Sequence, residues 1–308
     1  MSASITSIKD EHLALVRTLD TRARRHELRR CVLEGASLIE QAALSGADLD
    51  FALVAEDADD ALAADLRHRG VRVLVAREKL LRQALRTQRP VEWLAVAHLP
   101  PPDAPSGDFA VVLDHVLDPG NLGSIVRTAC GLGTPDVVCT DPDTDLTSRR
   151  VVDASRGAAL RARVHQFATF PEAAASLRSR GFRIIATSPR GRRLECAEWS
   201  GEPLALVVGN ETTGSGDEVL DQADQVVRIP MAGVVESLNV GVATGIGVYE
   251  LVRRMGRLDR PRGEVDAALH AASEVAGHRD AAAALAGFSR DETDQLLGYL
   301  ARIRANGG

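Results

Sequence analysis

The sequence predicts an α/β protein with two domains and a helical tail. Along residues 1–256, short apolar segments typical of strands alternate with longer segments typical of helices, which is the order found in α/β folds. Four prolines fall within 100–107, and such a segment is stiff and extended, as suits a linker. Beyond residue 256 the strand-like segments stop and alanine becomes frequent. We therefore expect a small α/β domain at 1–99, a linker at 100–107, a second α/β domain at 108–256 and a helical extension at 257–308.

The composition limits the class of protein. Hydrophobic residues make up 45% of the chain, a globular value that excludes wholesale disorder. Aromatic residues make up only 3%, which argues against a base-stacking surface for single strands. The four cysteines form no C-x-x-C pair, no apolar run has the length of a membrane span, and the first 30 residues are too charged for a signal peptide. These features predict a cytoplasmic protein with reduced thiols.

Charge is distributed unevenly along the sequence. The formal net charge of −6 argues against a protein uniformly adapted to nucleic acid, which is usually basic. The stretch 17–30 nevertheless holds six arginines against two acids, Asp20 and Glu27, so its local net charge is +4. These side chains form either a solvated helix face or a footprint for phosphates. The six are Arg17, Arg22, Arg24, Arg25, Arg29 and Arg30.

The first domain is predicted to hold a mostly parallel or mixed sheet. Its periodic and apolar segments suit four helices and three strands. The predicted helices cover 10–20, 33–45, 58–69 and 78–87, and the predicted strands cover 51–55, 71–75 and 93–98. Its histidines are scattered along the sequence, so we expect no metal site.

The second domain is predicted by sequence rules to be an open, doubly wound sheet. The predicted strands are 109–113, 137–139, 164–167, 182–186, 204–208 and 226–229. The predicted helices are 122–132, with Asn121 as its N-cap, then 147–160, 172–180 and 217–223. The basic segment 188–193 is predicted to be a loop. Helices are also expected in the tail, near 264–276, near 280–286 and from residue 289.

The stretch 229–250 combines a strand end, a loop and a helix start. Pro230 removes a backbone donor and ends the strand, Ser237 is the expected N-cap, and Asn239 is placed in the first turn. Three glycines in the helix, 241, 245 and 247, each cost roughly 1 kcal/mol against alanine, which indicates that another backbone comes very close. The stretch is either an ordinary packing unit or a ligand pocket at a helix N-terminus.

Three loops with small polar residues follow the carboxyl ends of predicted strands. They are 118–121, 209–214 and 231–239, and the ligands of open α/β sheets bind at that edge. None of the strand-to-helix turns carries G-x-G-x-x-G or G-x-x-x-x-G-K-[ST], which argues against a nicotinamide enzyme and against a P-loop protein.

The residues of these loops resemble the motifs of a known family. The loops read Asn121-Leu-Gly-Ser-Ile-Val-Arg127, Val208-Gly-Asn-Glu-Thr-Thr-Gly214 and Ile229-Pro-Met-Ala-Gly-Val-Val-Glu-Ser-Leu-Asn239. In this order and spacing they resemble the SpoU/TrmH branch of the SPOUT RNA methyltransferases, over about residues 107–256. The resemblance implies a deep trefoil knot near the C-terminal end of the sheet, a topology that general folding rules reject. It also implies a front RNA-binding domain and a homodimer whose interface includes the helix after Asn239.

The resemblance further implies a reaction and a set of site residues. The reaction is methyl transfer from S-adenosylmethionine to a ribose 2′-hydroxyl of structured RNA, without a metal. The favoured substrate is 23S ribosomal RNA; a tRNA substrate and a catalytically inactive RNA-binding protein are the alternatives. The implied catalytic residues are Arg127, Asn121, Glu211, Ser237 and Asn239. The implied cofactor contacts are Val208, Gly209, Ile229, Met231 and Leu238. The resemblance favours RNA binding for the arginine cluster of 17–30, with Arg149, Arg150 and the 188–193 segment as further contacts.

Overall fold

The computed structural model describes residues 4–58, 61–101, 105, 107–210, 214–231 and 237–258. Glu211, the middle of the predicted linker and the predicted tail helices lie outside these residues, so what the sequence implies for them stays a prediction. Contacts group the described chain into two units. The first unit holds the described residues up to 101, His115–Gly131 and Asp141–Val164. The second unit holds the described residues from 105 to Asp114, Leu132–Thr140 and those from His165 onward.

The first unit is built on a mixed five-stranded sheet, which confirms the prediction for the front of the chain. Its strand order is β1-β4-β3-β5-β2. The pairs β1–β4 and β3–β4 are parallel, whereas β3–β5 and β2–β5 are antiparallel. The strands are β1 (Ser4–Ile5), β2 (Arg30–Glu34), β3 (Leu49–Ala55), β4 (Arg72–Ala76) and β5 (Trp93–His98).

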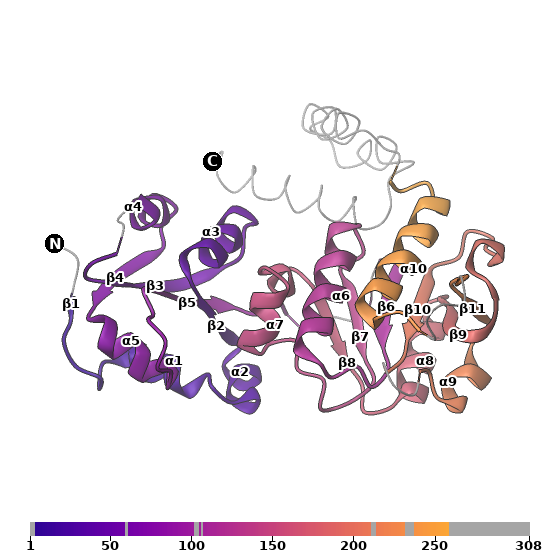
Figure 1. Ribbon diagram of the computed structural model, residues 1–308, viewed down its shortest axis with the longest axis horizontal. Helices are drawn as coiled ribbons and strands as arrows, with labels where there is room; N and C mark the ends of the chain where they lie inside the picture. The colour runs from indigo at the N-terminus through magenta and orange to yellow at the C-terminus, as the bar shows by residue number, and fades with distance from the viewer. Residues whose placement is uncertain are drawn as a thin grey trace. The chain divides into compact units, whose positions relative to one another are not determined.

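Helices cover both faces of this sheet (Figure 1). One face packs against α1 and α5 through buried leucines such as Leu13 and Leu81. The opposite face carries α3, whose Leu38 and Ile39 are buried. The helices are α1 (Glu11–Thr18), α2 (Arg22–Leu28), α3 (Ala36–Leu44), α4 (Ala61–His68) and α5 (Glu78–Leu85).

Two features of this region differ from the sequence prediction. The segment 33–45 was predicted to be one helix, but it starts inside strand β2 and becomes helical only after Gly35, whose φ of +96° separates the two elements. The buried run Cys31–Leu33 explains the strand, because it fills the sheet core. In addition, residues 22–28 form the short helix α2, whose bounds the sequence did not predict.

The first unit also contains α6 (Pro119–Gly131), α7 (Arg149–Ala154) and the short 3-10 turn η1 (Ala158–Leu160). The predicted helix 147–160 is therefore interrupted, because Arg156 and Gly157 adopt left-handed conformations with φ of 53° and 82°. Asn121 does not cap α6 as predicted. The cap is Asp118, whose side chain accepts from the Asn121 N–H at 2.8 Å, and the residue that follows Asp118 is a proline, which suits the first helical position.

The second unit is built on a six-stranded sheet with strand order β11-β9-β10-β6-β7-β8. The pairs β6–β7, β6–β10, β9–β10 and β9–β11 are all parallel. Helices α8 (Phe170–Ser179) and α9 (Asp217–Gln222) pack on one face, and α10 (Val240–Arg254) packs on β10 from the other (Figure 1). The strands are β6 (Phe109–Leu113), β7 (Asp136–Cys139), β8 (Arg163–Gln166), β9 (Arg183–Arg193), β10 (Leu204–Val208) and β11 (Gln225–Arg228).

The basic segment 188–193 was predicted to be a loop, but it is the second half of β9. Strand β11 pairs with β9 on both sides of a register shift, through Val226 with Ala186 and then Val227 with Arg192. Gly191 lies beside this register shift, where a Cβ atom would stand 2.5 Å from the Val227 carbonyl carbon. The polar sequence hid this strand because backbone pairing, and not side-chain burial, holds it.

All four cysteines are free thiols. Burial raises the pKa of the Cys31 thiol to about 12, so this cysteine is unreactive at neutral pH. Within the described ranges no helix is long and apolar enough to cross a membrane.

Candidate active site

Three parallel strands of the second unit bring their carboxyl ends to one edge of the sheet. The N–H of Asp114, directly after β6, donates to the Val208 carbonyl oxygen at the end of β10, at 2.9 Å. The buried Thr140, directly after β7, donates from Oγ1 to the Asp114 carboxylate at 2.8 Å. These bonds tie the ends of β6, β7 and β10 together, at the edge where α/β sheets bind ligands.

The loop after β10 folds back tightly on itself. Asn210 and Gly214 form an isolated antiparallel bridge, and the Gly214 N–H donates to the Asn210 carbonyl oxygen at 2.9 Å. Gly209 is buried below this bridge, and a Cβ atom there would stand 2.3 Å from the backbone of Gly214 and Ser215. Only glycine fits without moving the loop, because both nearest neighbours are backbone atoms.

The same loop is bonded to the neighbouring strand. The buried Ser215 donates from Oγ to the Thr187 carbonyl oxygen at 3.2 Å. Thr187 in turn donates from Oγ1 to the Val207 carbonyl oxygen at 3.1 Å. Ser215, directly after the loop, is therefore fixed to β9, and Thr187 ties β9 to β10.

Helix α10 begins after the third motif loop, and its cap differs from the prediction. Asn239, and not Ser237, is the N-cap, because its side chain accepts from the N–H groups of Gly241 and Val242 at 2.9 and 3.2 Å. Ser237 is exposed, two residues before the cap. The Asn239 side chain therefore satisfies two backbone N–H groups at the start of α10, directly after the loop that the sequence assigned to a ligand.

The sequence suggested that the glycines of α10 meet another backbone, but Gly247 does not. At Gly247 a Cβ atom would stand 2.8 Å from Cδ2 of Leu206 in β10, which is the end of a side chain. The helix thus lies directly on the central strand that leads to Val208 and Gly209. Of the other implied cofactor residues, Ile229 and Leu238 are half-buried, and Met231 is exposed at the surface.

The implied catalytic arginine lies on α6 in the first unit. The Arg127 side chain is exposed, and its guanidinium has no hydrogen-bond or ion-pair partner among the described residues. Asn121 lies in the first turn of the same helix and is half-buried. At Gly123 a Cβ atom would stand 2.4 Å from the Ala154 Cβ and 2.8 Å from the Ser155 N atom, so α6 is pressed against α7. The helix is held firmly while Arg127 stays available to a ligand.

A histidine–carboxylate pair, which the sequence analysis missed, precedes α6. His115 Nδ1 lies 2.6 Å from Asp141 Oδ2, and His115 adopts a left-handed φ of 55°. Burial acts to raise the pKa of Asp141, but hydrogen bonds from the Asp143 N–H and from His115 outweigh it, so the pKa of Asp141 lies below its ordinary value. No sequence pattern links residues so far apart, and the one available signal was a polar pair, Asp114–His115, directly after an apolar strand.

Comparisons with known proteins agree with this geometry. The family model of the SpoU rRNA methylase family matches residues 108–249. An uncharacterized tRNA/rRNA methyltransferase of Synechocystis is 30% identical over 84% of this chain and 97% of its own length. The chain belongs to the SpoU rRNA methylase family. It is accordingly an RNA methyltransferase, as the three motifs indicated.

Further relatives of the family extend over most of the chain. The 23S rRNA (adenosine(1067)-2′-O)-methyltransferase of Streptomyces laurentii is 36% identical over 66% of this chain and 76% of its own. The 23S rRNA (guanosine(2553)-2′-O)-methyltransferase RlmP of Bacillus subtilis is 28% identical over 80% of this chain and 98% of its own. The crystal structure of an AdoMet-bound rRNA methyltransferase from Sinorhizobium meliloti superposes with a TM-score of 0.68, at 28% identity, and covers 82% of this chain and 98% of its own.

The second unit has features that fit S-adenosylmethionine, the methyl donor that the family implies. At Gly209, at the strand edge, the backbone packs directly on that of Gly214 and Ser215, where no side chain fits. Directly after the neighbouring loop, Ser215 is bonded to Thr187 of β9, which fixes the backbone where the loop ends. A ligand recognised through backbone groups requires small, rigid surroundings of this kind.

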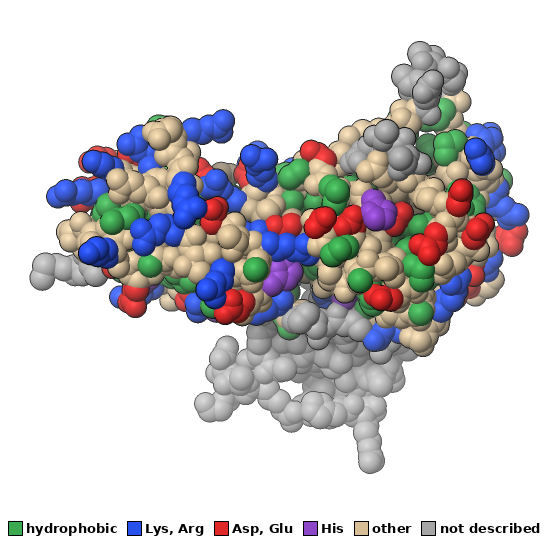
Figure 2. Space-filling model, turned by 90° about the horizontal axis from the view of Figure 1, so that it is seen from below, with side chains coloured by type: hydrophobic (Ala, Val, Ile, Leu, Met, Phe, Trp, Pro, Cys, Tyr) green, Lys and Arg blue, Asp and Glu red, His purple; other side chains and the backbone are tan. Residues whose placement is uncertain are grey.

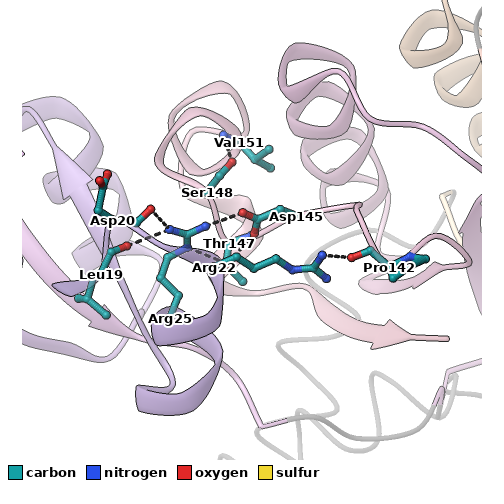
Figure 3. A network of polar contacts seen from close by, with 9 residues as sticks. All are labelled: Leu19, Asp20, Arg22, Arg25, Pro142, Asp145, Thr147, Ser148 and Val151. Carbon is teal, nitrogen blue, oxygen red and sulfur yellow. Dashed lines mark hydrogen bonds and ion pairs between the residues drawn. The ribbon is translucent and has the colours of Figure 1, made fainter. Parts of the chain in front are cut away.

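The arginines that the sequence assigned to RNA differ in their availability. Arg25 is buried and donates its hydrogen bonds inside the first unit (Figure 3). Arg30 pairs with Asp50, and Arg149 pairs with Glu34, both at 3.1 Å. Arg24 and Arg150 are exposed, whereas Arg17, Arg22 and Arg29 are half-buried. On the left of Figure 2, where the front sheet and its helices lie, Lys and Arg side chains are spread over the surface.

Proposed function

We propose that this protein transfers the methyl group of S-adenosylmethionine to a ribose 2′-hydroxyl of structured RNA, and that the RNA is 23S ribosomal RNA. The observation that carries the proposal is the match to two 23S rRNA 2′-O-methyltransferases, of which the chain spans 76% and 98%. The three motif loops lie within the matched family region, residues 108–249.

The proposed chemistry places little demand on the protein beyond positioning. S-adenosylmethionine supplies an activated methyl group, because its sulfonium is a good leaving group. The chain must hold the ribose oxygen about 3–3.5 Å from the methyl carbon and in line with the departing sulfur. Arg127 binds the neighbouring phosphate and stabilises the developing alkoxide while the hydroxyl proton passes to water and S-adenosylhomocysteine departs. Arg127 does not accept that proton itself, because its guanidinium stays protonated.

The remaining motif residues orient the two substrates. Asn121, Glu211, Ser237 and Asn239 position the nucleotide and Arg127. Backbone groups of Gly209, Ile229 and Leu238, flanked by Val208 and Met231, hold the adenine and ribose of the cofactor. No metal takes part in this scheme. The exposed side chain of Arg127 and the close packing of Gly209 on Gly214 and Ser215 support this assignment.

We infer that the sheet of the second unit is tied in a trefoil knot, as in other SPOUT proteins. The close approach of the backbone at Gly191 in β9 to Val227 in β11, and that of Gly209 to Gly214, support this inference. Both contacts bring backbone against backbone in the region between β9 and α10, where the family's knot lies.

The protein is further proposed to act as a homodimer in the cytoplasm, where its RNA is found. Val242, Ile246 and Tyr249 are exposed by 52%, 40% and 52%, and their spacing places them on one face of α10. An apolar stripe of this kind on a surface helix suits association with a second copy. The front domain, residues 1–99, binds the RNA through the arginines of the 17–30 stretch other than Arg25, with Arg149 and Arg150 as further contacts.

The test is methyl incorporation into purified RNAs. The protein is incubated with labelled S-adenosylmethionine and, in separate reactions, with 23S rRNA, 16S rRNA and bulk tRNA from cells that lack the protein. We expect label in 23S rRNA at a single nucleotide. Label in tRNA alone would move the substrate assignment to tRNA. No label in any RNA, with cofactor binding intact by calorimetry, would instead favour an inactive RNA-binding protein.

A further inference from the structure

Arg25 lies inside the first unit, where its side chain is only 7% exposed. Its guanidinium donates to the carbonyl oxygens of Leu19 and Asp20 at 2.9 and 2.8 Å, directly after α1. It also donates to Thr147 Oγ1 at 3.1 Å and to the Asp145 carboxylate (Figure 3). A buried arginine is tolerated only when its charge and donors are matched in this way. The residue therefore acts as a joint between the front helices and the 141–148 loop, and not as a surface contact.

The 141–148 loop is bonded on its other side to the segment that leads into α6. Thr144 donates from Oγ1 to the Val116 carbonyl oxygen at 3.2 Å. The Asp141 carboxylate holds the ring of His115 at 2.6 Å. Val116 is fully buried, so this segment is fixed by packing as well as by hydrogen bonds. The position of the loop thus sets where the chain enters α6.

A second route runs from the same loop through α7. Ser148 caps α7 by accepting from the Val151 N–H at 3.4 Å. Helix α7 packs against α6, where the gap at Gly123 is too small for a Cβ atom because the Ala154 Cβ would stand at 2.4 Å. Arg127 lies one turn further along α6 on the same rigid element. Two connections therefore lead from the 141–148 loop, which Arg25 holds, to the helix that carries Arg127.

We propose that Arg25 is a positioning residue for methyl transfer. Its bonds fix the 141–148 loop, and the loop fixes α6, so removal of the guanidinium displaces Arg127 from the position that the reaction requires. A misplacement of about 1 Å costs on the order of 100-fold in rate. The inference rests on the proposed function, in which Arg127 acts at the reacting ribose.

The test compares Arg25→Ala with Arg69→Ala, an exposed arginine of the same domain that pairs with Asp65. Methyl transfer to RNA is measured at saturating cofactor, well below the melting temperature of each variant. We expect kcat of Arg25→Ala to fall at least tenfold, with cofactor Kd within twofold and KM for RNA within threefold of the wild type. Arg69→Ala should match the wild type in all three.

Two results would overturn the inference. A lower melting temperature with unchanged kcat would mean that Arg25 only stabilises the fold. A raised KM for RNA with unchanged kcat would mean that it contacts RNA after all. An inactive wild type would refute the proposed function itself, whereas an active wild type with an unaffected Arg25→Ala variant refutes only this inference.

Milder variants keep the test decisive if Arg25→Ala fails to fold. Thr147→Val keeps the side-chain volume but removes one acceptor of the guanidinium, and we expect kcat to fall several-fold. Arg25→Lys keeps the charge but cannot reach all four acceptors, so its kcat should lie between those of the wild type and Arg25→Ala. Wild-type kcat in both milder variants would contradict the positioning role.

Discussion

Helices α6 and α10 are built alike but present opposite surfaces. Each begins at a polar cap, Asp118 for α6 and Asn239 for α10. On its exposed face, α6 presents the guanidinium of Arg127. On the exposed face of α10 stand apolar residues, including Ile246 and Tyr249. Helix α6 therefore exposes a positive charge, whereas α10 exposes an apolar stripe.

The glycines of the two helices show how firmly each is held. Gly123 of α6 faces the Ala154 Cβ and the backbone of Ser155, which cannot yield. Gly247 of α10 faces only the end of the Leu206 side chain, which can rotate. Helix α6 is therefore the more tightly fixed of the two. A helix that positions a catalytic charge needs this precision more than one that carries an apolar interface.

The largest effect is expected at the exposed charge of α6. Arg127→Ala should lower kcat about 100- to 1,000-fold, the usual loss when one group that stabilises developing negative charge is removed. Cofactor affinity should stay unchanged, because the proposed cofactor contacts lie after β10 and β11. Rates of methyl transfer and calorimetric titration measure the two quantities. Wild-type turnover in this variant would remove Arg127 from the chemistry.

The next effect separates the two glycines. Gly123→Ala should lower the free energy of unfolding by about 2–3 kcal/mol, because overpacking against rigid atoms is costly. Gly247→Ala should cost clearly less, since only a side-chain end must move. Gly131→Ala, in open space at the end of α6, is the control and should not destabilise the protein. Urea denaturation provides the comparison, and equal losses for the first two variants would show that α6 is no more tightly fixed than α10.

The apolar face of α10 is tested by a charge. Ile246→Asp places a carboxylate in the middle of the proposed dimer interface, so sedimentation should show a dimer for the wild type and a monomer for the variant. Ser124→Asp makes the same change on the exposed face of α6 and should leave the dimer intact. A wild type that sediments as a monomer would refute the proposed dimer, and a dimer in both variants would place its interface elsewhere.

Smaller and similar effects are expected at the two caps. Asp118→Ala and Asn239→Ala each remove the side-chain acceptor of a helix N-terminus, which usually costs about 1 kcal/mol. Thermal denaturation of both variants measures the loss. A negligible loss at Asn239, with a normal loss at Asp118, would indicate that α10 takes its start from the loop before it and not from its cap.

The His115–Asp141 pair, in the segment that leads into α6, should make the stability of the protein depend on pH. The pKa of Asp141 is lowered in the folded state from an ordinary value of 3.8, so its contribution to stability is present above that pH and is lost as the pH falls through the lowered pKa. Asp141→Asn should lack this acid-dependent component. Unfolding curves recorded from pH 5 to pH 2 provide the comparison, and parallel curves for the two proteins would argue against the His115–Asp141 bond.

Most strands could be predicted because they depend on local patterns. The strand at 204–208 is a run of five apolar residues, and the loops that follow such strands are polar and small. Strand β9 exceeded its prediction because the polar residues 188–193 are paired through their backbone with β11. The start of α10 was misplaced because Ser237 and Asn239 are both good caps, and only the folded chain shows which one bonds.

The contacts around Arg25 could not be predicted for a different reason. The side chain pairs with Asp145 and Thr147, which lie 120 and 122 residues further along the sequence. From composition alone, six arginines in one stretch look equivalent. In the folded chain Arg25 is buried, unlike the other five, and its charge is used inside the protein and not at the surface.

The chemical identity of the methylated product tests the central claim most directly. RNA labelled by the protein from S-adenosylmethionine is digested to nucleosides, and the labelled species are separated by mass spectrometry. The account predicts that the label appears in a 2′-O-methylnucleoside and is absent from the reaction with Arg127→Ala. Label in a base-methylated nucleoside, or equal labelling by the Arg127→Ala variant, would contradict it.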